Sequence, residues 1–433
     1  MKKTLIFDAE ILVNAAHKNS SRSGIFFTAY NIARVLNANK NINLVFYCDF
    51  NSYQQLKFVT KKLMPEFRNV NIYSPSIKNY YDRLIDFIVS LKNHSKNERH
   101  PILAKIFHLY GLLLKILFFI PRKVIKVKFS PMNADIFFSP FRKIPDMFAN
   151  NDRIKKYTLI HDVIPFLLPE YFDAALKNSH GHYWLEELVQ YMKQHKQDKY
   201  FSNSLCTKND FLKLIPELKP EQITVTLLAC AESFHPCSKQ ETISSLKKYN
   251  LPTDKKYVFS LCSLEPRKNL IRAVKTFIQF IKKNKIDDMV FILGGGHWKE
   301  FIGKLNAEIA DLGKYKDRII QAGYIDDEDL SPLYSGAEWF VYTSQYEGFG
   351  LPVLEAMACG CPVITSNKSS LPEVVGDAAI KIDYDSDTQH VEAYEKYYFN
   401  KKHRDKMAGK GLERAKEFSW NKTVNLMVAE MLK

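Results

Sequence analysis

The 433-residue chain has few cysteines and lacks any low-complexity tract. Its seven cysteines never form a CxxC pair and their number is odd, which favours reduced thiols over a disulfide framework or a structural zinc site. The apolar share of 46% is ordinary for a folded protein and excludes a disordered chain. We therefore expect a cytosolic protein with reduced thiols, and its length predicts two domains.

The N-terminus also lacks an uninterrupted apolar run. It reads MKKTLIFDAEILVNAA, and Asp8 and Glu10 break the apolar stretch that follows the two lysines. This pattern predicts a first β-strand and not a signal peptide. We expect the protein to remain in the cytoplasm.

Acidic residues are scarce in the first half of the chain. Residues 1–233 hold 33 Lys/Arg against 20 Asp/Glu, whereas the remainder holds 29 against 27. The excess is concentrated in residues 57–156, which hold 20 basic and 7 acidic side chains. This charge either serves solubility in general or attracts an anionic partner to the N-terminal half.

A strongly apolar segment lies inside this basic region, at residues 100–129. Between Ile102 and Ile120 only two lysines, one histidine and one glycine are not apolar, and four bases follow between residues 122 and 128. The internal lysines argue against a membrane span. Two interpretations stay open: a helix that lies in the membrane interface beside anionic lipid, and a core helix that packs on a sheet.

The C-terminal half alternates short apolar strands with amphipathic helices. We predict strands at 256–264, 289–296, 318–325, 338–344 and 362–367, and helices at 269–284, 327–337 and 351–360. Such alternation indicates a parallel, doubly wound sheet, in which ligands bind beyond the carboxyl ends of the strands.

The N-terminal half repeats this pattern less clearly. Candidate strands span residues 4–10, 43–49, 134–140, 155–163, 199–204 and 223–229, and the aperiodic stretch 229–239 is the expected linker. The fold class is therefore α/β, with two doubly wound Rossmann-like domains that face each other across a cleft. We place the domains at 1–232 and 240–416, followed by an amphipathic helix within 417–433.

The stretch SQYEGFGLPVLEAMACGCPVITSN, residues 344–367, holds the most specific motif. Gly348 and Gly350 let a turn approach a ligand closely, and Pro352 suits the first turn of a helix. Unpaired N–H groups at that helix start favour a phosphate. Glu355, about one turn into the helix, could accept two hydrogen bonds from a vicinal diol such as ribose. Stabilisation of the helix dipole would explain Glu355 alone but not the whole stretch.

Residues 346–379 resemble the signature of the retaining, nucleotide-sugar-dependent glycosyltransferases of family 4, glycosyl transferases group 1, which have the GT-B fold. Glu347 and Glu355 match the two glutamates of that signature, which seven residues separate. The likeness continues at 261–277 and 323–344, and more weakly at 21–36 and 159–165. It therefore spans most of the chain.

The resemblance implies roles for residues of the C-terminal half. Glu347 would lie at the donor sugar, near the backbone amides of Phe349, Gly350 and Leu351, and Glu355 would hold the ribose. Arg267 and Lys268 would bind the diphosphate, which agrees with two adjacent cations at a strand-to-helix turn. Tyr324 and Ile325 would lie near the nucleobase.

The resemblance also implies roles in the N-terminal half. His161 would lie near the donor sugar, and Gly24 would lie in the first strand-to-helix loop, which approaches the diphosphate. Asp162 is a candidate base or partner of an acceptor hydroxyl, although a carboxylate at this place could simply cap a turn. The last helix would cross back to the first domain.

The chemistry implied is sugar transfer with retention at the anomeric carbon, in which the leaving phosphate helps to deprotonate the acceptor. It needs no carboxylate nucleophile, so the two glutamates are not interpreted as a hydrolytic pair. No cofactor and no metal are expected: the acidic stretches 326–329 and 383–387 are explained by helix capping. The substrate expected is a nucleoside-diphosphate sugar of mannose, rhamnose, glucose or a similar hexose.

Two classes of function follow. The first is an enzyme that lies on the inner face of the cell membrane and transfers a sugar to a lipid-linked oligosaccharide or envelope polysaccharide. Its expected partners are the sugar donor, this acceptor and an anionic membrane surface. No nucleic-acid partner is expected. The second is a catalytically weak, transferase-like scaffold subunit that docks on membranes. A soluble enzyme that uses a sugar phosphate or sucrose is disfavoured by the basic apolar segment.

Overall fold

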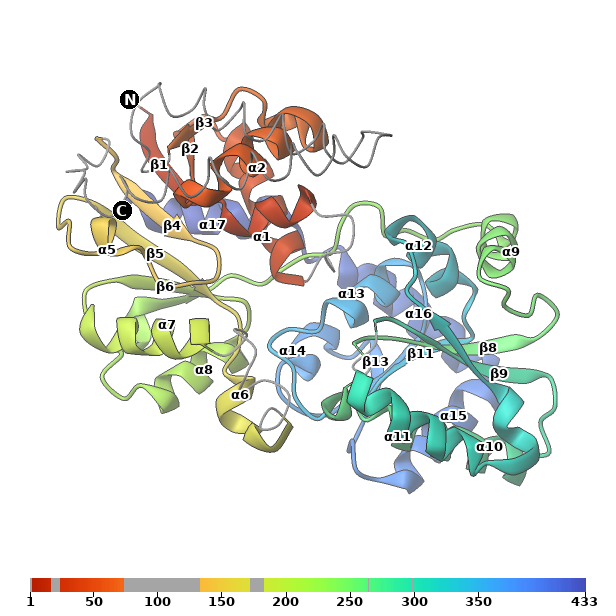
Figure 1. The fold of residues 1–433 in the computed structure, drawn as a ribbon. Helices are drawn as coiled ribbons and strands as arrows, with labels where there is room; N and C mark the ends of the chain where they lie inside the picture. The colour runs from red at the N-terminus through yellow and green to blue at the C-terminus, as the bar shows by residue number, and fades with distance from the viewer. Residues whose placement is uncertain (1, 17–23, 74–132, 172–182, 264, 297–298) are drawn as a thin grey trace, which may run out of the picture. The chain divides into compact units, whose positions relative to one another are not determined.

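The computed structural model describes residues 2–16, 24–73, 133–171, 183–263, 265–296 and 299–433 (Figure 1). The apolar segment 100–129 lies outside them, so both interpretations of that segment remain predictions. Within the described ranges, no helix combines the length and the apolar character that crossing a membrane requires.

Two parallel sheets form the framework, as the strand and helix alternation predicts. The first has the order β3-β2-β1-β4-β5-β6-β7. Its strands are β1 (Lys3–Asp8), β2 (Ile42–Tyr47), β3 (Asn71–Tyr73), β4 (Ile136–Ser139), β5 (Lys155–Ile160), β6 (Lys199–Ser202) and β7 (Ile223–Val225). Strand order that reverses at β1 and β4 is the mark of a doubly wound sheet, and the predicted fold class is confirmed.

The second sheet has the order β10-β9-β8-β11-β12-β13. Its strands are β8 (Lys256–Leu261), β9 (Met289–Gly294), β10 (Ile319–Gly323), β11 (Trp339–Tyr342), β12 (Val363–Ser366) and β13 (Ala379–Ile382). All five predicted strands of this half are present, and β13 is an addition. Each strand is short and rich in apolar residues, as expected for a parallel sheet buried on both faces.

The helices connect these strands. The first sheet is accompanied by α1 (Gly24–Ala38), α2 (Tyr53–Phe58), α5 (Asp146–Ala149), α6 (Ile164–Leu167), α7 (Tyr183–Gln194) and α8 (Leu205–Leu214). The second is accompanied by α9 (Lys239–Lys248), α10 (Leu270–Lys283), α11 (Lys299–Ala310), α12 (Asp327–Gly336), α13 (Leu351–Ala358), α14 (Leu371–Val375), α15 (Asp387–Phe399), α16 (Lys401–Ala415) and α17 (Trp420–Leu432).

Both faces of the second sheet are covered by helices. Figure 1 shows α10, α11 and α15 on one face and α12 and α13 on the other. Successive residues of β8 point to these two layers: Val258 packs in the cluster with α10 and α15, and the Phe259 ring lies 5.3 Å from that of Tyr334 on α12. Burial of one such large apolar side chain contributes about 1.5–3 kcal/mol, so this double cover fixes the sheet and the loops at its edge.

Contacts between Cα atoms divide the chain into two compact units. One consists of residues 1–140 and 144–156, and the other of residues 141–143 and 157–433. The linker was predicted at 229–239; residues 226–238 contain no helix or strand, and α9 begins at Lys239. The larger unit holds nearly all of the candidate site residues.

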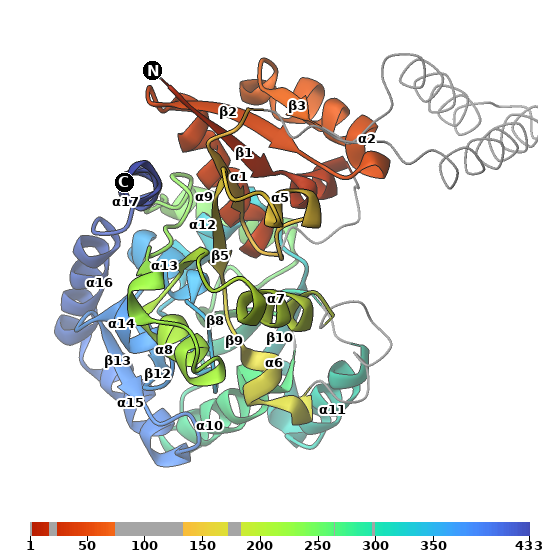
Figure 2. The same cartoon turned by 90° about the vertical axis from the view of Figure 1, so that its left-hand side faces the viewer.

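The C-terminal helix α17, marked in Figure 2, forms hydrogen bonds with residues that lie far earlier in the sequence. Thr423 Oγ1 donates to the carbonyl of Leu227, and Tyr157 donates its hydroxyl proton to the carbonyl of Glu430 at 3.2 Å. Lys199 Nζ lies 2.7 Å from the Glu430 carboxylate. The helix therefore closes residues 157–433 into one unit.

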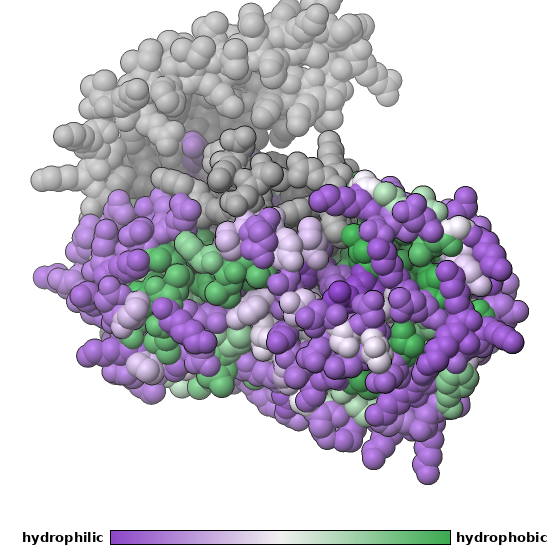
Figure 3. Space-filling model, turned by 90° about the horizontal axis from the view of Figure 1, so that it is seen from below, coloured by the Kyte–Doolittle hydropathy of each residue, from purple (hydrophilic) through white to green (hydrophobic). Residues whose placement is uncertain are grey.

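The molecular surface of the face in Figure 3 is mostly hydrophilic, with separate apolar patches. Within the described ranges, the exposed large apolar side chains include Phe166 and Leu167 of α6, which directly follow the His161–Asp162 loop. Isolated apolar side chains on a surface are ordinary and need no ligand to explain them.

Candidate functional site

The loops at the carboxyl ends of β8, β9 and β10 are joined by backbone hydrogen bonds. Cys262 donates its N–H to the Gly294 carbonyl at 3.2 Å, and Gly295 donates to the Gly323 carbonyl at 2.8 Å. A Cβ atom on Gly295 would lie only 1.9 Å from the Cys262 carbonyl oxygen, so only glycine fits there. This edge is where a doubly wound sheet binds its ligand.

Glu347 is held at this edge by two cations. Lys268 Nζ lies 2.7 Å and Arg267 Nη1 lies 3.0 Å from Glu347 Oε1. All three residues are buried, with at most 9% of their surface exposed. The structure thus brings together the predicted sugar-binding carboxylate and the predicted phosphate-binding cations. Because one glycosidic oxygen links the sugar and the phosphate of a nucleotide sugar, adjacent groups for the two parts suit such a ligand.

Two further residues complete this cluster, and neither was predicted from the sequence. Glu265 Oε1 lies 2.9 Å from Arg267 Nη2, and Tyr342, at the end of β11, accepts a hydrogen bond from Lys268 Nζ at 2.8 Å. The acid Glu265 stands two residues before Arg267 in the same turn, so alternating charge in that turn was the available signal. Tyr342 gave no signal beyond being the last residue of a buried strand.

The charge of Glu347 is fixed by its neighbours. Burial by itself would raise the pKa of Glu347, but Arg267 and Lys268 outweigh burial and lower that pKa to about 2. The carboxylate is therefore ionised and paired with cations, which makes it a poor base and a poor nucleophile but a good acceptor of hydrogen bonds from sugar hydroxyl groups.

Arg267 keeps one donor unused. Its Nη1 donates to the Tyr346 carbonyl and its Nη2 to Glu265, but its buried Nε has no hydrogen-bond partner within the described part of the chain. A buried N–H without a partner calls for a ligand acceptor, and a guanidinium suits a phosphate oxygen.

The glycine turn that follows Glu347 is tightly constrained. Gly350 has φ of +107°, in the left-handed region, and caps α13. A Cβ atom on Gly348 would lie 2.4 Å from the His161 carbonyl oxygen and 3.0 Å from Asp162 Cβ. The requirement for glycine at both positions is thus explained, and the second contact brings His161 and Asp162 to this turn.

His161 and Asp162 follow the end of β5. His161 is buried, with 7% of its surface exposed. Asp162 Oδ1 accepts a hydrogen bond from the Ile164 N–H at 3.1 Å, so the carboxylate does cap a turn. Burial raises the pKa of Asp162, while this hydrogen bond and the nearby Arg267 act against that rise. The turn-capping role and the role as acceptor partner are therefore compatible in one side chain.

Glu355 lies on α13, away from the cation pair. Its Oε2 accepts a hydrogen bond from the hydroxyl of buried Tyr334 at 3.1 Å. Burial raises the pKa of Glu355 to about 7, and the hydrogen bond from Tyr334 only partly offsets this effect. The two glutamates of the motif therefore have opposite electrostatic environments.

This difference gives a pH-dependent prediction for stability. Glu355 has a folded pKa above its unfolded value of about 4.5, so its neutral form stabilises the fold at pH 5 and that contribution is lost as pH rises through 7. We expect Glu355→Gln to raise the free energy of unfolding at pH 8.5 by about 1–3 kcal/mol and to change it little at pH 5. Thermal unfolding at both pH values measures this, with the surface variant Glu413→Gln as control. An equal effect at both pH values would contradict the prediction.

The remaining predicted residues lie in different settings. Ile325 is buried and Tyr324 is 62% exposed, directly after Gly323 at the end of β10. Phe349 is buried in the glycine turn, and Leu351 begins α13. Gly24 is the exposed first residue of α1 in the smaller unit, whereas the other four residues belong to the larger unit. The ligand roles of all five stay predictions.

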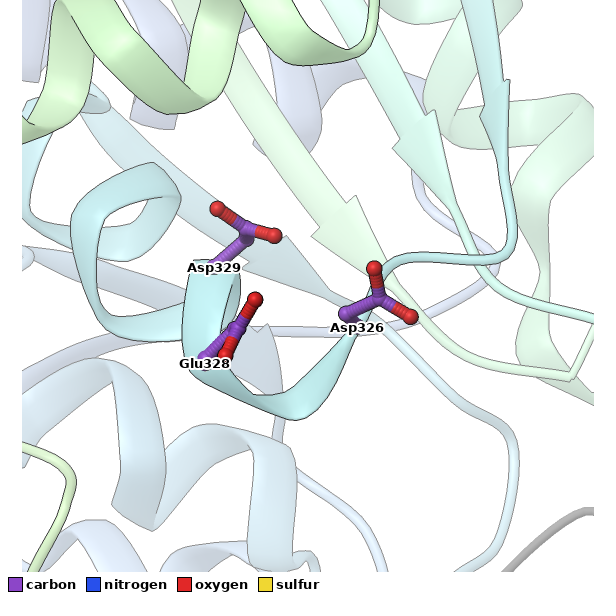
Figure 4. Close-up of side chains that lie close together, drawn as sticks. All are labelled: Asp326, Glu328 and Asp329. Atoms are coloured by element: carbon purple, nitrogen blue, oxygen red, sulfur yellow. The ribbon is translucent and has the colours of Figure 1, made fainter.

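The acidic stretch at the start of α12 binds a lysine. Figure 4 shows Asp326 on the loop before α12 and Glu328 and Asp329 on its first turn. Lys248 Nζ lies 3.0, 3.3 and 2.5 Å from these three carboxylates in turn. The prediction that capping explains this stretch is wrong for Asp326, whose side chain makes no cap hydrogen bond because it is engaged by Lys248 and Tyr249.

The second acidic stretch, 383–387, leads into α15. The helix is capped there by Ser386, whose side chain accepts a hydrogen bond from the N–H of Gln389. Asp387 lies in the first turn of α15, where a negative charge interacts favourably with the helix dipole. The cap of this helix is therefore a serine, and capping does not explain the aspartates of this stretch.

Comparisons with known proteins identify the family of the chain. Residues 242–414 match the family described as glycosyl transferases group 1. O-antigen chain mannosyltransferase B from Escherichia coli is 30% identical over 286 residues, which cover 64% of this chain and 70% of that protein. Serotype-specific mannosyltransferase WbdA from the same species is 27% identical over 286 residues, 65% of this chain but only 34% of that protein.

The fold has solved counterparts. Anabaena HepE, crystallised with UDP and glucose, superposes with a TM-score of 0.65 at 16% identity, over 100% of this chain and 99% of that one. Together with the two parallel sheets, this likeness shows the GT-B fold. The chain belongs to the glycosyl transferases group 1 of family 4, whose members transfer hexoses from nucleoside-diphosphate sugars.

Proposed function

We propose that the protein transfers a mannosyl residue from a nucleoside-diphosphate mannose, with retention at the anomeric carbon, to an O-antigen or similar polysaccharide chain. The observation that carries the proposal is the Glu347 carboxylate, which is paired with Lys268 and Arg267 beneath the glycine turn. The choice of mannose rests on the mannosyltransferases of Escherichia coli to which the chain is similar.

The residues of the site have separate roles in this reaction. Glu347 accepts hydrogen bonds from the sugar, and Lys268 with the unused Nε of Arg267 stabilises the charge that develops on the leaving diphosphate. Glu355 holds the ribose from α13. His161 and Asp162 lie beside the turn, where the acceptor hydroxyl approaches the sugar. The leaving phosphate takes the acceptor proton, so Glu347 needs no role as a base.

The acceptor is proposed to be lipid-linked and reached from the cytoplasmic membrane face. The support is the basic charge of residues 57–156, which suits an anionic lipid surface. In the same proposal, the N-terminal half of the chain binds the acceptor, and residues 240–416 bind the donor.

The proposal predicts selective stabilisation by the donor. A panel of mannose, glucose and rhamnose nucleotides is added to the protein, and thermal unfolding is followed. We expect the mannose nucleotide to stabilise most, by about 2.7 kcal/mol at a hundred times its dissociation constant. Labelled mannose should then pass from that donor into the lipid extract of membranes that carry lipid-linked oligosaccharides.

The possible outcomes separate the hypotheses. Stabilisation by a glucose or rhamnose nucleotide alone would overturn mannose but keep sugar transfer. Donor binding without transfer to any membrane fraction would favour the scaffold subunit. If no nucleotide sugar and no nucleoside diphosphate stabilises the protein, the proposed function is wrong.

A further inference from the structure

Three consecutive carbonyl groups of the glycine turn are each held by a buried hydroxyl group. Ser204 Oγ donates to the Gly348 carbonyl at 2.7 Å, and Thr207 Oγ1 lies 3.2 Å from the same oxygen. Ser370 Oγ lies 2.9 Å from the Glu347 carbonyl and 2.8 Å from that of Phe349, which share its one proton. The three hydroxyl residues are at most 1% exposed.

Holding a carbonyl fixes the N–H group of the same peptide. The peptide group is planar and trans, so its C=O and N–H point in opposite directions. The hydroxyls on the carbonyls of residues 347–349 therefore set the directions of the N–H groups of residues 348–350. Within the residues that the structure describes, no N–H of residues 348–351 donates a hydrogen bond to the protein. These donors are preset for a ligand.

The middle peptide is clamped from a distant part of the sequence. Ser204 is the N-cap of α8, and its Oγ accepts a hydrogen bond from the Thr207 N–H at 3.0 Å while its own proton goes to Gly348. Thr207 Oγ1 also lies 3.0 Å from the His161 carbonyl oxygen. The first turn of α8 thus ties the loop after β5 to the glycine turn.

We propose that Ser204 and Thr207 are positioning residues of the donor site, which aim the Phe349 N–H at an oxygen of the nucleotide sugar. The proposal rests on the proposed function. Neither side chain touches the reacting atoms; each acts through the peptide group between Gly348 and Phe349. The oxygen that receives this N–H is a sugar hydroxyl or a phosphate oxygen, since both lie at the Glu347 and Lys268 end of the ligand.

Thr207→Val tests the proposal, because valine keeps the branched shape and removes the donor. We expect kcat/KM for the donor to fall about tenfold, because a misdirected Phe349 N–H group stabilises the transition state less. The KM for the acceptor should stay unchanged. Thr207→Ser, which restores a hydroxyl, should recover most of the loss. Ser204→Ala should also lower kcat/KM for the donor. Because both hydroxyls hold the same carbonyl oxygen, the double variant should lower kcat/KM by little more than the two single variants combined.

A matched control separates positioning from folding. Thr276→Val removes an equally buried hydroxyl that donates to carbonyls of its own helix, α10, and lies away from the glycine turn. It should lower the melting temperature to a similar extent without changing donor kcat/KM. Full activity of folded Thr207→Val, or a Thr207→Ser variant as impaired as the valine variant, would overturn the inference. A wild-type protein that binds no nucleotide sugar would instead overturn the proposed function.

Discussion

Lys268→Met is expected to lower the turnover number of sugar transfer by about two to three orders of magnitude. Lys268 is the buried cation closest to Glu347, and its ammonium also lies 5.1 Å from the centre of the Tyr342 ring. Methionine keeps the length and the apolar stem but leaves the departing diphosphate without this charge. Because the site is buried, water cannot replace the missing ammonium.

Steady-state transfer kinetics with the mannose nucleotide measure this effect. Lys248→Met is the matched control, because Lys248 also pairs with several carboxylates but does so at the start of α12. It should leave turnover within about twofold, since surface ion pairs contribute about 1 kcal/mol or less. A Lys268→Met protein that is folded and retains more than a tenth of wild-type turnover would show that the leaving group is stabilised elsewhere.

Gly348→Ala is expected to reduce kcat/KM by about a hundredfold and to destabilise the protein by about 1–3 kcal/mol. The new Cβ atom would lie 2.4 Å from the His161 carbonyl oxygen, a backbone atom that cannot swing aside. Relief of this clash must move either the glycine turn or the loop after β5. The backbone of Gly348 is not in the left-handed region, so the expected losses of activity and stability come from this steric contact alone.

The control for this variant is Gly409→Ala in α16, where an added Cβ would meet nothing within 4 Å. Alanine favours a helix interior over glycine by about 1 kcal/mol, so this variant should be neutral or stabilising and fully active. Both proteins are compared by thermal unfolding and by transfer rate. Wild-type activity and stability in Gly348→Ala would mean that the two loops do not meet as described.

Long segments in which apolar residues recur at a regular spacing predicted most of the fold. The run at 269–284 matches α10 to within one residue at each end, because its apolar positions follow a helical period without a break. The strands β3 and β13 were missed. β3 has only three residues, and β13 places the polar Lys381 among apolar neighbours, so neither forms a run that stands out from a loop.

The site was predictable where its residues are adjacent in the sequence. Arg267 and Lys268 share one turn, and Glu347 and Glu355 share one motif. Ser204 and Thr207 were not found, because a serine before a helix predicts only an N-cap and nothing local points to a partner more than 140 residues away. Hydroxyl groups that act on a peptide group leave no pattern of charge or period in the sequence.

The contacts of α17 with β5 and β6 also constrain how the protein is made. Tyr157 and Glu430 are 273 positions apart, yet they share a hydrogen bond inside one compact unit. During synthesis, the strands of residues 155–225 leave the ribosome long before the helix that covers them. We expect these strands to reach their final packing only after α17 has been synthesised, because contacts between distant segments form late. A nascent chain cut short before residue 420 would leave this surface without its covering helix, so we expect such a truncated chain to fold poorly.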